Sequence, residues 1–418
     1  MPKLTIRDVN LRGKRVLVRV DYNVPLEESG GRVVITDDTR IRETLPTLNL
    51  LREQGARIIL ASHLGRPKGK RDSSLSLAPV AQRLAELTGR PVQFVDDCVG
   101  AEVEETVANL QNGDLLLLEN VRFYPEEEAN DPQFAARLAS VADAYVNDAF
   151  GSAHRAHAST EGAARVVASR GGPCVAGLLM EKELYYLGHE LENPAKPFVV
   201  ILGGAKVSDK IMVIQRLLEK ADALLIGGAM AYTFRLAQGH KTGKSLVEPD
   251  KIDVAKAAVA EAERRGVKFL LPVDDVVAVP VKTDKLDKKG KPVIDYQQVR
   301  VNSTLDTPDG FAGLDIGPAT VRAYSEVIKG ARTILWNGPM GLFENKTFAQ
   351  GTNDIAKAVV EATERGAKSI IGGGDSVKAL NKLGFGPKVT FMSTGGGASL
   401  EFLEGKVLPG VAVLNDKA

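Results

Sequence analysis

Cationic and hydrogen-bonding side chains gather in short polar segments of the first half of the chain, after runs of apolar residues. The segments VDYNVP, DDTRIRETLP, ASHLGRP, LENVRFYP and NDAFGSAHRAHAS supply Asp21, Asn23, Arg40, His63, Arg66, Arg122, His154, Arg155 and His157. Taken singly, each residue is also typical of a turn, a loop or an exposed surface. Several arginine side chains and a histidine at one place would repel one another unless a multiply charged anion lies among them. The set therefore predicts a site for a small phosphorylated carboxylic acid.

Glycine-rich segments follow apolar runs in the second half of the chain. They are LGGAKVSDK, IGGAMAYTF, WNGPMGLFE, GGGDS and STGGGAS. Glycine lets backbone N–H groups approach a phosphate closely, and the N-terminus of a following helix adds the positive end of its dipole. These segments therefore predict a site for the phosphates of a nucleotide.

Three charged residues of the glycine-rich segments have a chemical interpretation. Lys206 and Lys210 are four residues apart at the start of an expected helix, so they would share a face. Two like charges on one face are unfavourable without a bound anion, although two solvated lysines at a helix end are the alternative. Asp375 is either a helix N-cap or the carboxylate that holds Mg²⁺ beside the phosphates.

Two searches for nucleotide motifs fail. GHKTGKS, at residues 239–245, has three residues between its glycines where a Walker A loop needs four, and it follows a helical stretch rather than a strand. The sequence contains no G-x-G-x-x-G, which argues against a nicotinamide or flavin enzyme of Rossmann type, and no zinc spacing of His, Cys or Glu.

Runs of Val, Ile and Leu that end at Gly, Asp, Asn or Ser alternate with helical stretches along the chain. About ten such runs lie at residues 15–20, 57–61, 115–118, 144–146, 198–202, 223–226, 269–273, 333–336, 369–371 and 389–392. Continuous apolar runs of this kind indicate strands buried on both faces, and therefore parallel sheets with crossover helices. Ligands of such sheets bind beyond the carboxyl ends of the strands, where the polar and glycine-rich segments lie.

The strands fall into two groups, before residue 150 and after residue 195, which indicates two domains in this chain of 418 residues. The predicted fold class is α/β, with two doubly wound, Rossmann-like domains of mostly parallel sheets joined by a hinge helix within residues 177–197. The polar run at residues 284–300 is interpreted as a solvated hairpin inserted in the second domain, rather than as a binding arm.

Charge and composition narrow the range of partners. Lys and Arg number 54 against 53 Asp and Glu, so no global basic field attracts nucleic acid or an anionic membrane. Cys98 and Cys174 have no metal-ligand spacing, and we interpret both as buried apolar residues in a reducing compartment. The first residues contain no apolar signal core, and no run approaches the ~20 apolar residues of a membrane span. We expect a cytoplasmic protein with small-molecule substrates and with neither nucleic acid nor membrane partners.

Eight ordered segments cover essentially the whole chain: VDYNVP, ASHLGRP, LENVRFYPEE, NDAFGSAHRAHAS, LGGAKVSDKI, LWNGPMGLFE, GGGDS and MSTGGGASLEFLEGK. They closely resemble the phosphoglycerate kinase family. The resemblance implies reversible phosphoryl transfer between 1,3-bisphosphoglycerate with MgADP and 3-phosphoglycerate with MgATP, in glycolysis and gluconeogenesis. It implies a bilobal, usually monomeric enzyme, with residues 1–176 and 406–418 binding phosphoglycerate, a hinge at 177–197, and residues 198–405 binding nucleotide.

The resemblance also implies the ligands, residue by residue. The phosphoglycerate ligands would be Asp21, Asn23, Arg40, His63, Leu64, Gly65, Arg66, Arg122 and Arg155, with His157 behind them. The nucleotide ligands would be Gly203, Gly204, Lys206, Lys210, Gly227, Gly228, Gly313, Leu314, Asn337, Glu344, Gly373, Gly374, Asp375 and Ser376. Within that set, Glu344 would contact the ribose and Asp375 would hold Mg²⁺ through the nucleotide. The catalytic residues would be Arg40, Lys206 and Gly373.

The acceptor in that reaction is a carboxylate, whose unperturbed pKa near ~4 leaves it ionised at neutral pH, so no general base is needed. The reaction needs in-line alignment of two anions and positive charge on the transferred group. Arg40 and Lys206 are the candidates for that charge; Arg40 begins an expected helix whose first turn normally favours acids. We expect direct transfer in a closed interdomain cleft, with hinges near residues 177–197 and 393–406.

Two other functions are weighed against this one. Another acyl-phosphate kinase, acting on a small carboxylate such as acetate, would not need several arginines at the acceptor edge, because its substrate carries no phosphate. A non-catalytic nucleotide-binding scaffold would lack Arg40, Lys206 or Asp375, and all three are present.

Overall fold

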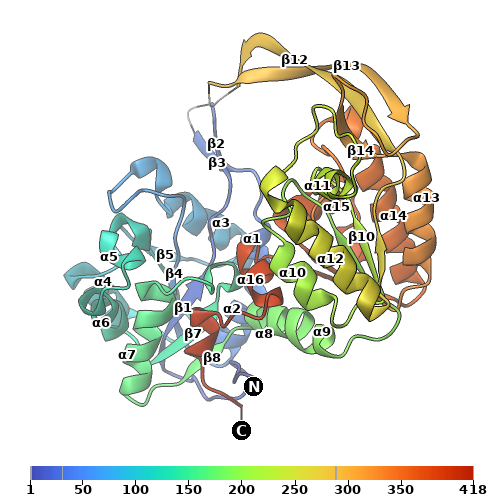
Figure 1. Ribbon diagram of the computed structural model, residues 1–418. Helices are drawn as coiled ribbons and strands as arrows, with labels where there is room; N and C mark the ends of the chain where they lie inside the picture. Colours follow the sequence, from blue (N-terminus) through green and yellow to red (C-terminus); the bar gives the residue numbers. More distant parts are fainter. Residues whose placement is uncertain (1, 31, 288–289, 418) are drawn as a thin grey trace. The chain divides into compact units, whose positions relative to one another are not determined.

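The computed structural model of the chain describes residues 2–30, 32–287 and 290–417 (Figure 1). The chain divides into two compact units. Unit 1 consists of Met1–Tyr185 and Lys406–Ala418, and unit 2 consists of Tyr186–Gly405. Among the helices of the described residues, none combines the length and the apolar character that crossing a membrane requires.

Unit 1 is built on a parallel sheet that, in its described part, has six strands in the order β5-β6-β4-β1-β7-β8. The strands are β1 Arg15–Val20, β4 Arg57–Ala61, β5 Gln93–Val95, β6 Leu115–Leu118, β7 Ala144–Asp148 and β8 Cys174–Ala176, and a separate hairpin is formed by β2 Leu26–Ser29 and β3 Arg32–Ile35. The helices are α1 Thr39–Arg42, α2 Leu45–Glu53, α3 Ala78–Thr88, α4 Ala101–Asn109, α5 Pro125–Glu128, α6 Pro132–Ser140, α7 Ala163–Ser169, α8 Leu178–Leu184 and α17 Pro409–Ala412.

Both faces of the unit 1 sheet are covered, because alternate residues of its central strands are buried alike. Val16 and Val18 of β1 belong to a core shared with α2 and α3, while Leu17 on the opposite face is equally buried. The C-terminal segment belongs to this unit: Asn147 Nδ2 donates to Gly410 O at 3.0 Å. The continuous apolar runs predicted as strands therefore form a sheet that is buried on both faces.

Unit 2 contains a second parallel sheet, with six strands among the described residues in the order β11-β10-β9-β15-β16-β17. The strands are β9 Phe198–Leu202, β10 Ala223–Ile226, β11 Lys268–Leu270, β15 Thr333–Asn337, β16 Lys368–Gly372 and β17 Phe391–Met392. A smaller antiparallel sheet is formed by β12 Asp275–Leu286, β13 Pro292–Asn302 and β14 Ala312–Ile316. The helices are α9 Glu190–Glu192, α10 Ile211–Leu217, α11 Met230–Ala237, α12 Ile252–Arg265, α13 Pro318–Lys329, α14 Gln350–Glu364, α15 Gly374–Lys382 and α16 Gly397–Leu403.

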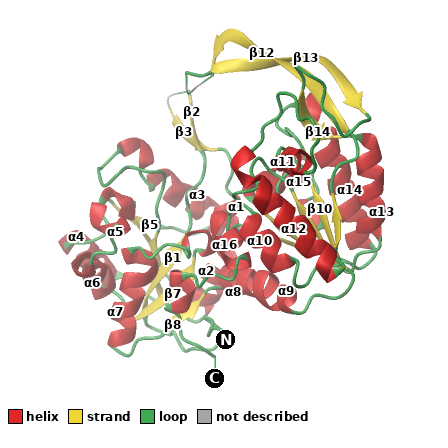
Figure 2. Ribbon diagram, in the orientation of Figure 1, coloured by secondary structure: helices red, strands yellow, loops and turns green. Residues whose placement is uncertain are grey.

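The predicted fold class is confirmed, since each unit is an α/β fold on a parallel sheet. Each of the ten predicted strands overlaps a strand of these sheets, although β11 ends at Leu270 rather than at residue 273. Strands β5 and β8, of three residues each, were not predicted. The hairpin expected at residues 284–300 is longer than predicted and forms β12 and β13 (Figure 2).

The buried carboxylate of Asp148, the last residue of β7, connects this strand to the start of α8. Asp148 Oδ1 accepts from the backbone N–H groups of Leu179 and Met180 at 2.9 and 3.1 Å, in the first turn of α8. Burial raises the pKa of Asp148 to about 7. Gly177, directly before the helix, leaves room for this contact, because a Cβ added there would lie 2.2 Å from Asp148 Oδ1.

Gly177→Ala is therefore expected to lower the free energy of unfolding by about 1–3 kcal/mol, because the added methyl group overpacks a closed joint. Urea unfolding of the purified variants measures this difference. The matched control is Gly397→Ala, where an added Cβ meets no described atom within 4 Å. Equal stability of Gly177→Ala and the parent protein would contradict the proposed crowding.

Candidate active site

The loops that follow β1, β4 and β6 in unit 1 are tied together by short polar contacts. Asn23 Oδ1 accepts from the backbone N–H of Gly65 at 2.9 Å, and Arg122 Nη1 donates to Gly65 O at 2.9 Å. Tyr22 N donates to Ser62 Oγ at 2.9 Å, which links the first two loops again. Three of the predicted acceptor-site residues, Asn23, Gly65 and Arg122, are thus brought into direct contact.

Arg40 reaches the same edge through an ion pair. Its Nη1 atom lies 2.6 Å from Asp21 Oδ1, with the Arg40 side chain 35% exposed. Burial alone would raise the pKa of Asp21, but the positive charges of Arg40 and Arg19 and the hydrogen bond from the Asn23 backbone N–H act against burial and lower this pKa. Asp21 is therefore a fixed negative charge that orients Arg40 and partly offsets its charge.

His63 is buried at this edge as a neutral ring. Burial lowers its pKa well below the ordinary value, and the nearby arginines lower it further. Its Nδ1 atom lies 3.1 Å from Arg19 Nη2. Because a guanidinium group can only donate, Nδ1 accepts, and the ring proton is on Nε2. His63 can thus donate a hydrogen bond to an anion without adding a charge.

Arg19, Ser159 and Glu127 form a buried network behind His63 that was not predicted from the sequence. Arg19 Nε donates to Ser159 Oγ at 2.7 Å, and Ser159 donates to Glu127 through Oγ at 2.5 Å and through its backbone N–H at 2.8 Å. Burial raises the pKa of Glu127. The available signal was an arginine inside the apolar run RVLVRV, since a buried guanidinium requires partners.

The remaining predicted residues of unit 1 differ in exposure. Leu64 is buried, whereas Arg66 and Arg155 have exposed side chains at the loops. Arg155 is close enough for its charge to lower the pKa of Arg122 and of His157. His157 is buried, with Nδ1 4.0 Å from Glu127 Oε1, and burial followed by the arginine charges lowers its pKa to about 4.

In unit 2, the glycine-rich turns after β9, β10 and β15 pack backbone against backbone. Gly203 N donates to Asn337 O at 3.0 Å, Gly204 N to Pro339 O at 3.1 Å, and Gly228 N to Met340 O at 2.9 Å. A Cβ at Gly203 would lie 2.0 Å from Pro339 O. Only glycine permits this approach, and it leaves a surface of backbone groups at the strand ends.

The predicted shared helix face of Lys206 and Lys210 is wrong. The helix α10 begins only at Ile211, and the preceding residues form turns, because the chain must first leave β9 through Gly204, whose φ is 113°. Lys206 is exposed, whereas Lys210 is buried and donates from Nζ to both O and Oδ1 of Asn337 at 2.7 Å. Burial lowers the pKa of Lys210 to about 7.

Asn337 and the start of α15 complete the edge of the unit 2 sheet. Asn337 is buried, and its Nδ2 atom has no hydrogen-bond partner among the described residues, so it is a donor available to a ligand. Gly373 is the N-cap residue of α15, which removes that role from Asp375. Ser376 Oγ accepts from the backbone N–H of Gly338 at 2.6 Å.

A cavity of about 470 Å³ lies in unit 2 beside these groups. Its lining includes the predicted nucleotide residues Gly204, Gly228, Gly313, Leu314, Glu344 and Asp375. Other predicted residues lie at the strand ends, in the turns or in the first turn of α15: Gly203, Lys210, Gly227, Asn337, Gly373, Gly374 and Ser376. The cavity also contains residues that were not predicted, among them Tyr232, Asp275, Tyr296 and Asp315. Burial raises the pKa of Asp315 to about 7.

The segment at residues 239–245, rejected as a Walker A loop, braces the cavity wall instead. Ser245 Oγ accepts from the backbone N–H of Gly313 at 2.9 Å, and Lys244 N donates to Phe311 O at 2.7 Å. Gly243 has φ 53° and approaches Phe311 O so closely that a Cβ would lie 2.4 Å from it. Its glycine is thus explained by packing against β14.

The donor set suits phosphates with a divalent ion held partly by the ligand. Within the described part of the chain, no three His, Cys, Asp or Glu side chains gather closely enough to hold a metal ion. Asp375, on the first turn of α15 and at the cavity lining, offers one carboxylate. Mg²⁺ is commonly bound through one or two carboxylates together with substrate phosphates, so these residues fit a nucleotide-bound Mg²⁺.

The two parallel α/β units, one with a cation-rich edge and the other with glycine turns around a buried lysine, define an α/β phosphotransferase. A model of the family described as phosphoglycerate kinase matches residues 6–406. The chain belongs to the phosphoglycerate kinase family, whose members are phosphotransferases with a carboxyl acceptor, and the resemblance seen in the sequence is confirmed.

Individual relatives agree with the family assignment. The chain is 56% identical over 423 residues to the phosphoglycerate kinase of Koribacter versatilis, and 56% identical over 417 residues to that of Moorella thermoacetica, with 100% of each chain covered in both cases. The solved phosphoglycerate kinase from Coxiella burnetii is 40% identical with a TM-score of 0.83, covering 99% of this chain and 98% of its own.

Binding of ADP is expected to take up a proton above pH 7. In the free protein at pH 8 Lys210 is mostly uncharged, because burial lowers its pKa to about 7; nearby phosphates favour the charged form and raise that pKa. Affinity should therefore fall as pH rises from about 7 to 9. Calorimetry at pH 8, in buffers of different ionisation enthalpy, measures the uptake.

The variants Lys210→Met and Lys206→Met form a matched pair for this measurement. The buffer dependence of the binding enthalpy should disappear in Lys210→Met and persist in Lys206→Met, whose side chain is exposed. A binding enthalpy of the parent protein that is the same in all buffers would show that Lys210 does not change its protonation.

Proposed function

We propose that this chain catalyses the reversible transfer of a phosphoryl group between 1,3-bisphosphoglycerate with MgADP and 3-phosphoglycerate with MgATP, as a step of glycolysis and gluconeogenesis. The observation that carries the proposal is the family match over residues 6–406, which includes the strand ends of both units. The polar edge of unit 1 and the cavity of unit 2 supply the chemistry that two such anionic substrates require.

On the acceptor side, we assign phosphoglycerate to the edge of unit 1. Its ligands would be Asp21, Asn23, Arg40, His63, Leu64, Gly65, Arg66, Arg122 and Arg155. The cations there suit a substrate with both a phosphate and a carboxylate, and neutral His63 adds a donor. The acceptor carboxylate is ionised at neutral pH, so the chain needs only to bind and orient it.

On the nucleotide side, we assign ADP or ATP to the cavity of unit 2 and its neighbouring turns. The glycine backbone, buried Lys210 and the unpaired Nδ2 of Asn337 would bind the phosphates, while Gly313, Leu314 and Glu344 would contact the nucleoside. Mg²⁺ bound with the nucleotide would neutralise charge on the phosphates. Asp375 would hold that ion from the protein side.

Catalysis would rest on positive charge placed around the phosphoryl group during in-line transfer. We propose Arg40 and Lys206 for this role, together with the backbone N–H groups near Gly373. The side chains of Arg40 and Lys206 are both exposed enough to contact a ligand. Arg40 belongs to unit 1 and Lys206 to unit 2.

A coupled assay tests the proposed function directly. We expect the protein in the cytoplasmic fraction of the cell, and we expect it to elute at the size of a single chain. Once purified, it should form ADP from MgATP in the presence of 3-phosphoglycerate. Acetate in place of 3-phosphoglycerate should give no turnover, because it carries no phosphate for the arginines of unit 1. Turnover with acetate but not with 3-phosphoglycerate would instead identify another acyl-phosphate kinase.

Arg40→Ala should lower kcat by about 10³- to 10⁵-fold, the range of arginines that stabilise a transferred phosphoryl group. Binding of ADP, measured by calorimetry, should be unchanged, since Arg40 lies in the other unit. Arg42→Ala, two residues away on α1 and paired with Asp38, is the control and should keep its kcat. If Arg40→Ala kept a near-normal kcat and only its KM for phosphoglycerate rose, the catalytic assignment would be rejected.

A further inference from the structure

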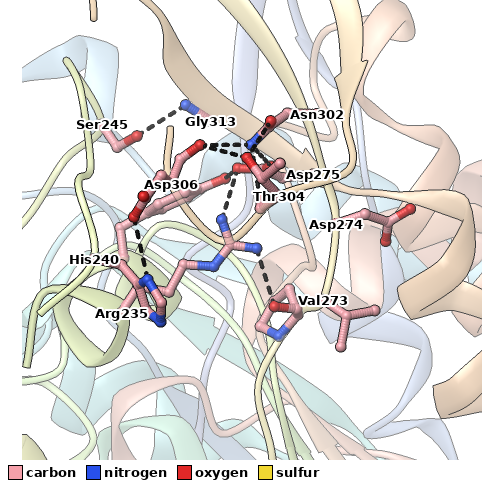
Figure 3. Close-up of polar contacts among 12 residues, drawn as sticks. Arg235, His240, Ser245, Val273, Asp274, Asp275, Asn302, Thr304, Asp306 and Gly313 are labelled. Atoms are coloured by element: carbon pink, nitrogen blue, oxygen red, sulfur yellow. Dashed lines mark hydrogen bonds and ion pairs between the residues drawn. The ribbon is translucent and has the colours of Figure 1, made fainter. Parts of the chain in front are cut away.

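Two arginines that are each 1% exposed, Arg19 and Arg235, are compensated in different ways. Arg235 of α11 contacts a carboxylate directly, with its Nη1 atom 3.0 Å from Asp275 Oδ2 (Figure 3). Arg19 of β1 instead reaches the carboxylate of Glu127 through the hydroxyl group of Ser159. This indirect arrangement takes up Nε of Arg19 and leaves its terminal nitrogens for other partners.

The direction of each hydrogen bond in this buried network follows from the chemistry of its groups. Arg19 Nε, 2.7 Å from Ser159 Oγ, can only donate, so Oγ accepts there. The hydroxyl proton of Ser159 is therefore donated to Glu127 Oε1, at 2.5 Å. At the other end, Arg19 Nη2 donates to Nδ1 of His63 at 3.1 Å. Arg19 thus donates in both directions, and Glu127 is the terminal acceptor.

Glu127 of α5 is suited to be that terminal acceptor. Its Oε1 atom accepts from the hydroxyl group of Ser159, and its Oε2 atom accepts from the backbone N–H of the same residue at 2.8 Å. Both oxygens accept, which is the pattern of an ionised carboxylate. Burial raises the pKa of Glu127, while the charge of Arg19 and the two bonds from Ser159 favour the ionised form. A negative charge here compensates the buried guanidinium group.

Ser159 is held in place by contacts on both sides of its backbone. It lies in a π-helical turn, Ala158–Gly162, a conformation that is rare and frequently occurs at functional sites. Its N–H is bound by Glu127, and its carbonyl oxygen accepts from the hydroxyl group of Tyr145 at 2.9 Å. The position of Ser159 Oγ, and with it the position of the Arg19 side chain, is therefore fixed by residues of α5 and β7.

The consequence for His63 is the choice between its two neutral tautomers. With the proton on Nε2, the ring can donate a hydrogen bond to an anion. With the proton on Nδ1, the ring would direct that proton at the donor Nη2 of Arg19, and its Nε2 lone pair would repel an anion. The placement of Arg19 therefore decides whether His63 attracts or repels an anionic ligand.

We infer that Glu127 and Ser159 are positioning residues for the acceptor substrate. They hold Arg19 so that it donates to Nδ1 of His63 and keeps the ring proton on Nε2, where it can be donated to a phosphorylated carboxylic acid. The identity of that anion rests on the proposed function, whereas the control of the tautomer does not. A purely structural role for the network, compensation of a buried charge, would affect stability and leave the tautomer unchanged.

Nitrogen NMR of the ligand-free protein, isotopically labelled at its five histidines, measures the tautomer directly. The signals of His63 are assigned from their loss in His63→Gln. In the parent protein at neutral pH, Nε2 should be protonated and Nδ1 unprotonated. Glu127→Gln has no charge and offers one acceptor oxygen in place of two, so the signals should shift toward those of the Nδ1–H form. Unchanged signals of His63 in Glu127→Gln would overturn the inference.

The matched control is Glu119→Gln, because Glu119 is another buried carboxylate of unit 1 with the same kinds of donor. It accepts from the hydroxyl group of Ser76 at 2.6 Å and from the backbone N–H of Leu77 at 2.8 Å. The hydroxyl oxygen of Ser76 accepts from the backbone N–H of Ala78 instead of from an arginine. Glu119→Gln should therefore keep the tautomer of the parent protein. The same shift of the His63 signals in Glu119→Gln would show that general loosening causes it and would reject the positioning role.

A second pair of variants tests the same network if Glu127→Gln does not fold. Ser159→Ala removes the hydroxyl group between Arg19 and Glu127 and should shift the tautomer in the same direction. Ser159→Thr keeps the hydroxyl group and should keep the parent tautomer. A parent-like tautomer in Ser159→Ala would contradict the inference as directly as one in Glu127→Gln.

Calorimetric titration with 3-phosphoglycerate measures the effect on binding. Glu127→Gln and Ser159→Ala should each weaken this binding by about ten- to a hundredfold, the range for one hydrogen bond to a charged group. Binding of ADP should be unchanged, because the network belongs to unit 1. In the coupled assay, the KM for 3-phosphoglycerate should rise while kcat stays near the parent value, as expected for a lost binding contact. Undiminished affinity of both variants for 3-phosphoglycerate would overturn the positioning role.

These measurements separate the inference from the proposed function, because the tautomer is observed without any substrate. A tautomer that depends on Glu127, in a parent protein that neither binds nor converts 3-phosphoglycerate, would support the control of His63 and contradict the proposed reaction. Full activity with a tautomer that is indifferent to Glu127 and Ser159 would support the reaction and contradict the inference.

Discussion

Repulsion among like charges at the sheet edge of unit 1 is the constraint on which the rest of that site depends. Arg19 of β1, Arg40 of α1 and Arg122 all contact the loops that follow β1 and β4. The fold answers this repulsion in two ways. It places the carboxylate of Asp21 against Arg40, and it buries His63 so that the ring stays uncharged.

The candidate site of unit 2 is built mainly from backbone groups rather than from pairs of opposite charges. Its glycine turns approach one another so closely that no side chain would fit at Gly203, and the N–H and C=O groups of the strand ends are brought together. Lys210 is buried among them and held by Asn337. Burial disfavours the charged form of Lys210 in the free protein. A bound anion would favour that charged form, so Lys210 can supply a positive charge when an anion binds.

Much of the fold, and the grouping of several candidate site residues at the strand ends, could be predicted from the sequence. The apolar runs end at polar or glycine-rich turns, and parallel strands bring such turns to one edge, so residues as distant as Asn23 and Gly65 could be grouped by sequence pattern alone. The partners of buried charges could not be predicted in this way. Arg19 was visible within an apolar run, but its partners Ser159 and His63 lie 140 and 44 residues away from it in the sequence.

The sequence by itself determined the residue types, the order of the strands along the chain and the family, because these are local patterns that survive without knowledge of packing. Only the tertiary structure decided which of two neighbouring lysines is buried, since Lys206 and Lys210 look equivalent until the turn after β9 is traced. It also decided that the polar hairpin has an apolar face at the cavity. Exposure and cross-strand register depend on distant contacts, and no local pattern contains them.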